Sequence, residues 1–213
     1  MTSLIDHPIY LPFSIPGGNS LNIYFKLNIL FLYLMAIFSN PHITIASAAD
    51  IPAIKDLLNY AYRGEGSKQG WTTEADLIAG DIRTDENNLQ EVMKQPGSVF
   101  LKYKGDKKQI TGCVNLQKHS GKIYLGMFCV SPQLQGAGIG KQLLKAAEEY
   151  ALQVHCKAIY MSVISVRTEL IGWYKRHGYM ETGERKPFIE DGLTGKHLRV
   201  LEFMVLEKPL NSR

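Results

Sequence analysis

Residues 130–144 read V-S-P-Q-L-Q-G-A-G-I-G-K-Q-L-L, and this stretch decides the fold. It joins the end of an apolar, strand-like run to a segment whose apolar residues recur at helical spacing up to about His155. Gly136, Gly138 and Gly140 lack a Cβ, so the backbone there can turn sharply and present successive N–H groups to a ligand. The helix adds its unpaired N-terminal donors and the positive end of its dipole. The stretch therefore predicts a pyrophosphate-binding loop between a strand and a helix.

Spacing separates three kinds of phosphate-binding loop. A Walker A loop requires G-x-x-x-x-G-K-[ST], but Gly140-Lys141 is followed by Gln142. A dinucleotide fingerprint requires G-x-G-x-x-G and an acidic residue about 20 positions later, and neither condition is met. The pattern Q/R-x-x-G-x-G/A is met by Gln135, Gly138 and Gly140. This pattern resembles the coenzyme A loop of the GNAT family of N-acetyltransferases.

A second block of sequence strengthens the resemblance. Residues 166–179, V-R-T-E-L-I-G-W-Y-K-R-H-G-Y, follow the apolar run 158–164 and are similar to the family's second signature, a short helix carrying W/F-Y-x-x-x-G-F/Y. The resemblance implies that Tyr174 donates a proton to the departing thiolate. Many family members have Asn seven residues before this tyrosine, whereas this chain has Arg167. That residue could contact a phosphate or pair with Glu169, and the sequence leaves both readings open.

The remaining patterns predict one α/β (α+β) domain. The runs at 42–47, 98–103, 109–118, 122–130, 158–164 and 198–206 are typical of strands, and a further strand is expected at 179–188. Helical segments are expected to begin after Asp50, at Thr72 or Thr73, and at Ile139. Together with the resemblance, these elements imply a mixed, mostly antiparallel sheet of about seven strands flanked by helices. We expect the N-acetyltransferase domain to span residues 42–208, with 209–213 as a tail.

Residues 1–41 differ in composition from the rest of the chain, because only Asp6 and Lys26 carry a formal charge. The apolar run 29–38 is short for a membrane span of roughly 20 residues. The segment also lacks the basic n-region of a signal peptide. We therefore expect residues 1–41 to be an apolar extension outside the fold. A translation start at Met35 is the favoured explanation, with a membrane-associated anchor and a genuine accessory segment as the alternatives.

Composition argues against several other classes of function. The three cysteines are odd in number and lack C-x-x-C spacing, which predicts neither a disulfide framework nor a zinc site. The net charge of +4 is mild and forms no basic run, so nucleic-acid binding is not indicated. We expect a cytoplasmic enzyme that binds no metal and no membrane. A homodimer is compatible with the sequence.

The resemblance implies an enzyme that moves the acetyl group of acetyl-CoA to a primary amine of a small molecule, peptide or protein by direct attack. A non-catalytic acyl-CoA-binding or sensing module on the same fold is the alternative. Tyr174 is expected to be the general acid, because a phenol that donates to sulfur stabilises charge appearing only as the thiolate leaves.

Backbone N–H groups around residues 128–130 are expected to hold the pantetheine arm, and the glycine-rich loop to hold the pyrophosphate. The residues expected to bind the cofactor are Phe128, Cys129, Val130, Gln135, Gly136, Ala137, Gly138, Ile139, Gly140, Lys141 and Arg167. The acceptor-side candidates are Glu65, Trp71 and Glu74. Either glutamate is a candidate base for the amine, although such residues are more often solvated or helix-start charges.

Overall fold

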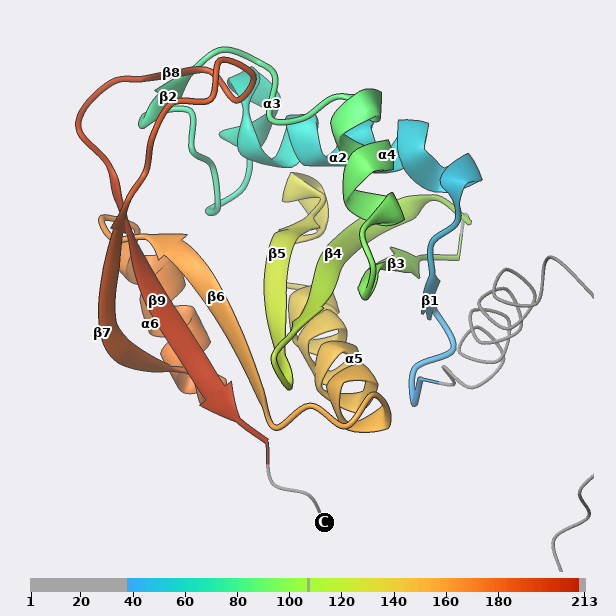
Figure 1. Ribbon diagram of the computed structural model, residues 1–213. Coiled ribbons are helices and arrows are strands. Elements are labelled where there is room, and N and C mark those ends of the chain that lie inside the picture. Colours follow the sequence, from blue (N-terminus) through green and yellow to red (C-terminus); the bar gives the residue numbers. More distant parts are fainter. Residues whose placement is uncertain (1–37, 107, 211–213) are drawn as a thin grey trace, which may run out of the picture. The chain divides into compact units, whose positions relative to one another are not determined.

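The computed structural model describes residues 38–106 and 108–210, which form a mixed sheet flanked by helices (Figure 1). In chain order the elements are β1 (Ile43–Ile45), α2 (Ile51–Tyr62), α3 (Gly64–Ser67), β2 (Ile78–Ala79), α4 (Glu86–Lys94), β3 (Ser98–Lys104), β4 (Ile110–His119), β5 (Lys122–Val130), α5 (Ile139–Gln153), β6 (Ala158–Ile164), α6 (Thr168–Arg176), β7 (Met180–Pro187), β8 (Lys196–His197) and β9 (Glu202–Pro209).

The main sheet has seven strands in the order β1-β3-β4-β5-β6-β9-β7, and β2 pairs with β8 in a small second sheet. All neighbours in the main sheet are antiparallel except β5 and β6. The predicted α/β (α+β) fold, with about seven mostly antiparallel strands flanked by helices, is confirmed.

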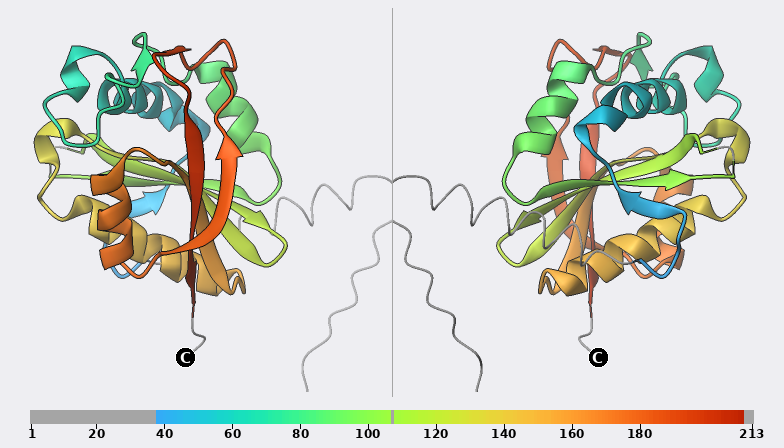
Figure 2. Two further views of the ribbon diagram at one scale, coloured as in Figure 1. Left: turned by 90° about the vertical axis from the view of Figure 1, so that its left-hand side faces the viewer. Right: turned by 90° about the vertical axis from the view of Figure 1, so that its right-hand side faces the viewer.

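Helices cover both faces of this sheet. The helices α2 and α4 lie on one face and α5 on the other (Figure 2). Successive residues of a strand point to opposite faces: Phe100 and Cys113 pack with α2 and α4, whereas Leu101 and Val114 pack with α5. All four are fully buried. Because both faces are core, β3 and β4 are apolar at successive positions through their centres and do not alternate in polarity.

Most predicted elements occur close to their expected positions. The strands β5 and β6 match the runs 122–130 and 158–164, and α5 begins at the predicted Ile139. The helix predicted at Thr72 or Thr73 is wrong, because this segment forms turns that lead into β2. The Thr73 hydroxyl accepts a hydrogen bond from the Ala75 N–H (3.1 Å), which competes with helix formation. The helix α4 was not located from the sequence.

The folded part extends a few residues beyond the predicted bounds of 42 and 208. Phe38 is 6% exposed and belongs to the core on the α5 face, so the boundary placed after residue 41 is too late. At the other end, Pro209 pairs with Ala158, and the Leu210 N–H donates to the Lys157 carbonyl at 2.7 Å. Residues 1–37 and 211–213, which complete the predicted extension and tail, lie outside the described residues.

Two further properties concern the described residues alone. No helix in the described ranges has the length and apolar character that a membrane crossing requires. In the same part of the chain, His, Cys, Asp and Glu side chains do not gather in threes as the ligands of a metal ion would. The three cysteines are free and buried.

Candidate active site

The site is built where β5 and β6 separate. These strands pair in parallel only from Lys122, opposite Ala158, to Tyr124, opposite Tyr160. Beyond this point, residues 125–130 of β5 have no strand partner on the β6 side in the described sheet. Backbone N–H and C=O groups on that edge require other hydrogen-bond partners. The separation therefore leaves a polar backbone edge that a bound ligand can pair with.

A β-bulge shapes the end of β5. Its pairing with β4 shifts so that Met127 and Phe128 together oppose Val114, and Met127 takes a positive φ of 43°. The hydroxyl of Tyr62, at the end of α2, donates to the Phe128 carbonyl at 2.6 Å. Burial raises the pKa of Tyr62 well above its ordinary value, which keeps this phenol a neutral donor. Sequence reasoning missed Tyr62, because only folding brings the helix end to the bulge.

The glycine-rich loop leaves open space at the N-terminus of α5. Gly136 and Gly138 have φ of 91° and 82°, which glycine adopts without strain. A Cβ at Gly136 would meet no atom within 4 Å, and one at Gly138 would meet only the Gln142 amide nitrogen, at 3.8 Å. Backbone conformation, not crowding by the protein, therefore requires these two glycines. The space above them is free for a ligand.

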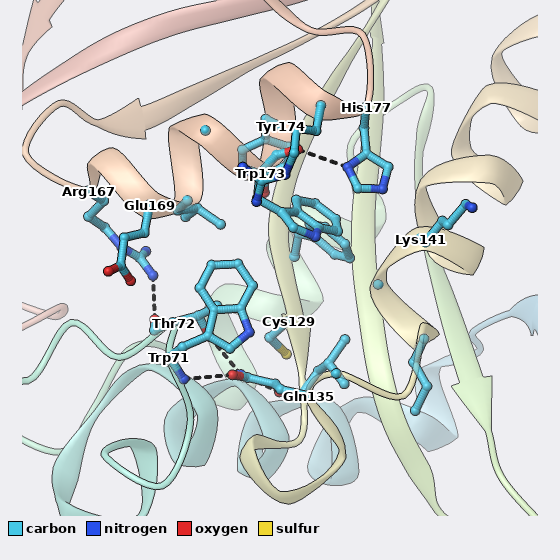
Figure 3. Close-up of a pocket in the computed structure, with 18 of the residues that line it drawn as sticks. Trp71, Thr72, Cys129, Gln135, Lys141, Arg167, Glu169, Trp173, Tyr174 and His177 are labelled. Atoms are coloured by element: carbon cyan, nitrogen blue, oxygen red, sulfur yellow. Dashed lines mark hydrogen bonds between the residues drawn. The ribbon is translucent and has the colours of Figure 1, made fainter.

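A cleft of about 770 Å³ extends from this loop to α6 (Figure 3). Of the predicted site residues, those that line it are Trp71, Phe128, Cys129, Val130, Gln135, Gly136, Gly138, Ile139, Gly140, Lys141, Arg167 and Tyr174. Three predicted residues are not among its lining residues. Ala137 is adjacent in the loop, Glu65 is exposed and pairs with Lys68 at 2.6 Å, and Glu74 lies buried behind the cleft. Glu65, predicted to lie on the acceptor side, therefore does not line this cleft.

Aromatic side chains line the cleft around Trp173. The centroid of its ring system lies 6.3 Å from that of Trp71, 6.1 Å from Phe128 and 4.2 Å from His177. Trp71 is 44% exposed, so the cleft remains open on that side. His177 was not predicted as a site residue. It follows Trp173 by one helical turn, the spacing that places two side chains on the same face of a helix.

Tyr174 lies where this cleft meets a smaller recess between β5 and β6. Burial raises the pKa of its phenol well above the ordinary value of about 10. The positive charge of Arg167 opposes this shift without reversing it. Within the described residues, the Tyr174 hydroxyl forms no hydrogen bond. It is therefore a neutral donor whose proton is available to a ligand.

Glu74 is held between two arginines. Its Oε2 lies 2.5 Å from Arg63 Nη1 and its Oε1 lies 2.8 Å from Arg167 Nη1. The three side chains are 8%, 0% and 10% exposed, in the order Glu74, Arg63 and Arg167. A carboxylate with both oxygens engaged by guanidinium groups is not placed to take a proton from an amine. The prediction that Glu74 is a candidate base is therefore corrected.

Arg167 joins the start of α6 to the segment that carries Trp71. One of its Nη atoms pairs with Glu74 and the other donates to the Thr72 carbonyl. It forms no ion pair with Glu169 among the described contacts, so the surface pairing considered from the sequence does not occur. From the other side of the cleft, Gln135 accepts from the Trp71 N–H (2.9 Å) and donates to the Thr72 hydroxyl (2.7 Å). The Trp71–Thr72 segment is thus tied to both the loop and α6.

Cys129 lines the cleft but is not an activated thiol. Its Sγ lies 3.6 Å from that of Cys113, and burial raises the pKa of the Cys129 thiol well above its ordinary value. Cysteine chemistry requires the thiolate, which this environment disfavours. We interpret Cys129 as a packing residue whose backbone belongs to the β5 edge.

A parted strand pair, a bulge and a glycine-rich loop at a helix N-terminus thus border one cleft. The family model described as the acetyltransferase (GNAT) domain matches residues 68–201, which is more than half of the chain. The chain belongs to the GNAT family, as its sequence motifs implied.

Solved structures agree with the fold. Ribosomal-protein-alanine N-acetyltransferase from Brucella melitensis has a TM-score of 0.60 at 19% identity, over 79% of this chain and 99% of that one. The yncA protein from Salmonella typhimurium, solved with its cofactor acetyl-CoA, has a TM-score of 0.58 at 20% identity, over 82% and 96%.

A curated relative, spermine/spermidine N(1)-acetyltransferase from Bacillus subtilis, is 33% identical over 66 residues. The match covers 30% of this chain and 43% of that protein, so it spans less than half the length of the relative.

Proposed function

We propose that this protein is an N-acetyltransferase that transfers the acetyl group of acetyl-CoA directly to an amine. One observation carries the proposal. Three features border the same cleft: the edge of β5 that has no strand partner on the β6 side in the described sheet, the open loop at the start of α5, and the Tyr174 hydroxyl, which has no hydrogen-bond partner among the described residues. Each suits a different part of a thioester substrate: the pantetheine arm, the pyrophosphate and the sulfur.

The cleft residues fit an acyl-CoA. Backbone N–H groups of Gly136 and residues 138–141, with the cation of Lys141, would bind the pyrophosphate at the N-terminus of α5. The edge of β5 at residues 125–130 would bind the pantetheine amides as a neighbouring strand does. An N–H on this edge, held in place by the bulge and by Tyr62, would polarise the thioester carbonyl. Acetyl-CoA supplies the activated acetyl group.

Tyr174 would protonate the leaving group. In the reaction a bond forms between the amine nitrogen and the acetyl carbon, the C–S bond breaks, and the sulfur receives the Tyr174 proton. Because neither Glu65 nor Glu74 is placed as a base, we assign to water the proton that the amine loses. Water then returns a proton to the Tyr174 phenolate, so the general acid is restored for the next cycle. A primary amine with a pKa near 10.4 is almost entirely protonated at pH 7. The rate should therefore rise with pH as the neutral fraction of the amine grows.

The test combines binding and turnover. Purified protein is titrated with acetyl-CoA while the fluorescence of Trp71 and Trp173 is followed, since both indoles line the cleft. The same protein is then assayed for thiol release with amines, amino acids, polyamines and peptides, and products are identified by mass. Binding followed by acetylation of one class is expected. Binding without acetylation of any class would favour the non-catalytic module, and absence of binding would refute the cofactor assignment.

A further inference from the structure

The buried cluster of Arg63, Glu74 and Arg167 contains two cations and one anion. Among the described residues, neither arginine has a second carboxylate partner. Their remaining hydrogen bonds go to backbone carbonyls: Arg63 donates to those of Tyr62 and Thr194, and Arg167 to that of Thr72. A buried charge without a counter-ion is costly. The cluster therefore favours one additional anion.

Arg167 is the arginine placed to receive it. The Arg63 side chain is 0% exposed, and its Nε and Nη2 both donate to the Thr194 carbonyl. Arg167 lines both the cleft and the recess between β5 and β6. Its Nε forms no hydrogen bond within the described residues. Arg63 and Glu74 thus hold Arg167 in position, and Arg167 presents its charge to the space where substrates meet.

The recess itself contributes no negative charge. It has a volume of about 70 Å³, and its polar side chains are Tyr62, Ser162, Arg167 and Tyr174. Burial raises the pKa of both tyrosines, so both are neutral. With roughly 30 Å³ for each water molecule in the liquid, the recess holds about two waters or a group of similar size. It accommodates an amine and one or two carbons, without a carboxylate to stabilise a second cation.

We infer that the acceptor is a small amine with its own carboxylate close to the nitrogen, as in a free α-amino acid, and that Arg167 binds this carboxylate. The inference rests on the proposed acetyl transfer and names its substrate class. A polyamine would place further positive charge beside Arg167 in a recess whose described lining contains no carboxylate. Glu169 lines the larger cleft and is not part of the recess. A phosphate of acetyl-CoA is the other source of an anion. The carboxylate of the acceptor is favoured over that phosphate as the anion bound by Arg167. The reason is that Arg167 lies on the opposite side of the cleft from Lys141, which belongs to the phosphate loop (Figure 3).

The experiment compares an α-amino acid, its carboxamide and spermidine as acceptors, with rates expressed per neutral amine. The wild-type protein should prefer the amino acid by about tenfold or more in kcat/KM, as a charge-assisted hydrogen bond implies. Arg167→Gln should remove most of this preference, and Arg167→Lys should retain part of it. Arg199→Gln is the matched control, because Arg199 is exposed and lies outside the cleft.

Binding provides a second measurement. The affinity of each variant for the amino acid and for coenzyme A is measured by calorimetry, and folding is checked by thermal melting. Arg167→Gln should weaken binding of the amino acid. Its dissociation constant for coenzyme A should change by no more than about threefold, which is less than the usual contribution of one hydrogen bond. Weaker binding of coenzyme A alone would show that Arg167 binds a phosphate of the cofactor, and this would overturn the inference. If the wild-type protein acetylates spermidine with a kcat/KM equal to or above that of the amino acid, the inferred substrate class is wrong, but the proposed acetyl transfer still stands. That comparison needs no variant to fold.

Discussion

Replacing Tyr174 with Phe tests the proposed chemistry most directly, because it removes one oxygen and keeps the ring. The ring contacts those of Phe128, Trp173 and Tyr179, at centroid distances of 6.3, 5.1 and 5.7 Å. Since the hydroxyl has no hydrogen-bond partner in the described residues, the free energy of unfolding should change by no more than about 0.5 kcal/mol. The loss of a general acid should lower kcat about 10²-fold, which corresponds to about 2.7 kcal/mol of transition-state stabilisation.

The assay is thiol release at saturating acetyl-CoA, with affinity for coenzyme A measured in parallel. Tyr179→Phe is the matched control, because the Tyr179 hydroxyl is buried, has no partner in the described residues and lies outside the cleft. The control should keep its kcat, whereas Tyr174→Phe should lose kcat with little change in KM. A Tyr174→Phe variant with near wild-type kcat would show that water protonates the sulfur. Tyr174 would then be a packing residue.

The pH dependence follows from the direction of the Tyr174 pKa shift. Because burial raises this pKa, the phenol stays protonated through pH 7 and well into the alkaline range. Its ionisation should therefore produce no alkaline limb up to about pH 10. Activity should instead rise with pH as the acceptor loses its proton, with the same profile shape in the wild type and in Tyr174→Phe. An activity loss between pH 8 and about 10 that disappears in the variant would contradict this reasoning.

Three other substitutions test the loop, the cluster and the edge of the domain. Gly138→Val forces a β-branched residue into a left-handed conformation, and we expect coenzyme A affinity to fall about tenfold or more by calorimetry. Gly105→Val, in open space without a positive φ, is its control. Glu74→Gln leaves two buried guanidinium groups without a carboxylate and should cost about 3–5 kcal/mol in urea unfolding. A loss under about 1 kcal/mol would mean that water reaches the cluster. Phe38→Ala should cost about 3 kcal/mol if its buried position is correct, and an unchanged midpoint would refute it.

The parts of the site that could be predicted are continuous in sequence. The end of β5, the glycine-rich loop and the start of α5 follow one another over residues 130–144, so glycine spacing and helical periodicity are both visible within one stretch. Tyr174 likewise lies within one continuous motif, residues 166–179, which contains α6. In such segments local backbone preferences and the fold agree, and pattern and structure coincide. The failed helix at Thr72 differs because contacts from Gln135 and Arg167, distant in sequence, fix its conformation.

The acceptor side could not be predicted, because folding alone brings its parts together. Glu74 and Arg167 are 93 residues apart, and Arg63 and Thr194 are 131 apart. A glutamate near an acceptor site is a reasonable candidate base when its carboxylate is free. The same glutamate between two guanidinium groups is a counter-ion that positions them. Folding thus converts the predicted base into a support for Arg167, and the charge that remains in the recess is positive. An amine that enters it as a neutral molecule meets no penalty from that charge, and a carboxylate attached to the amine is attracted to it.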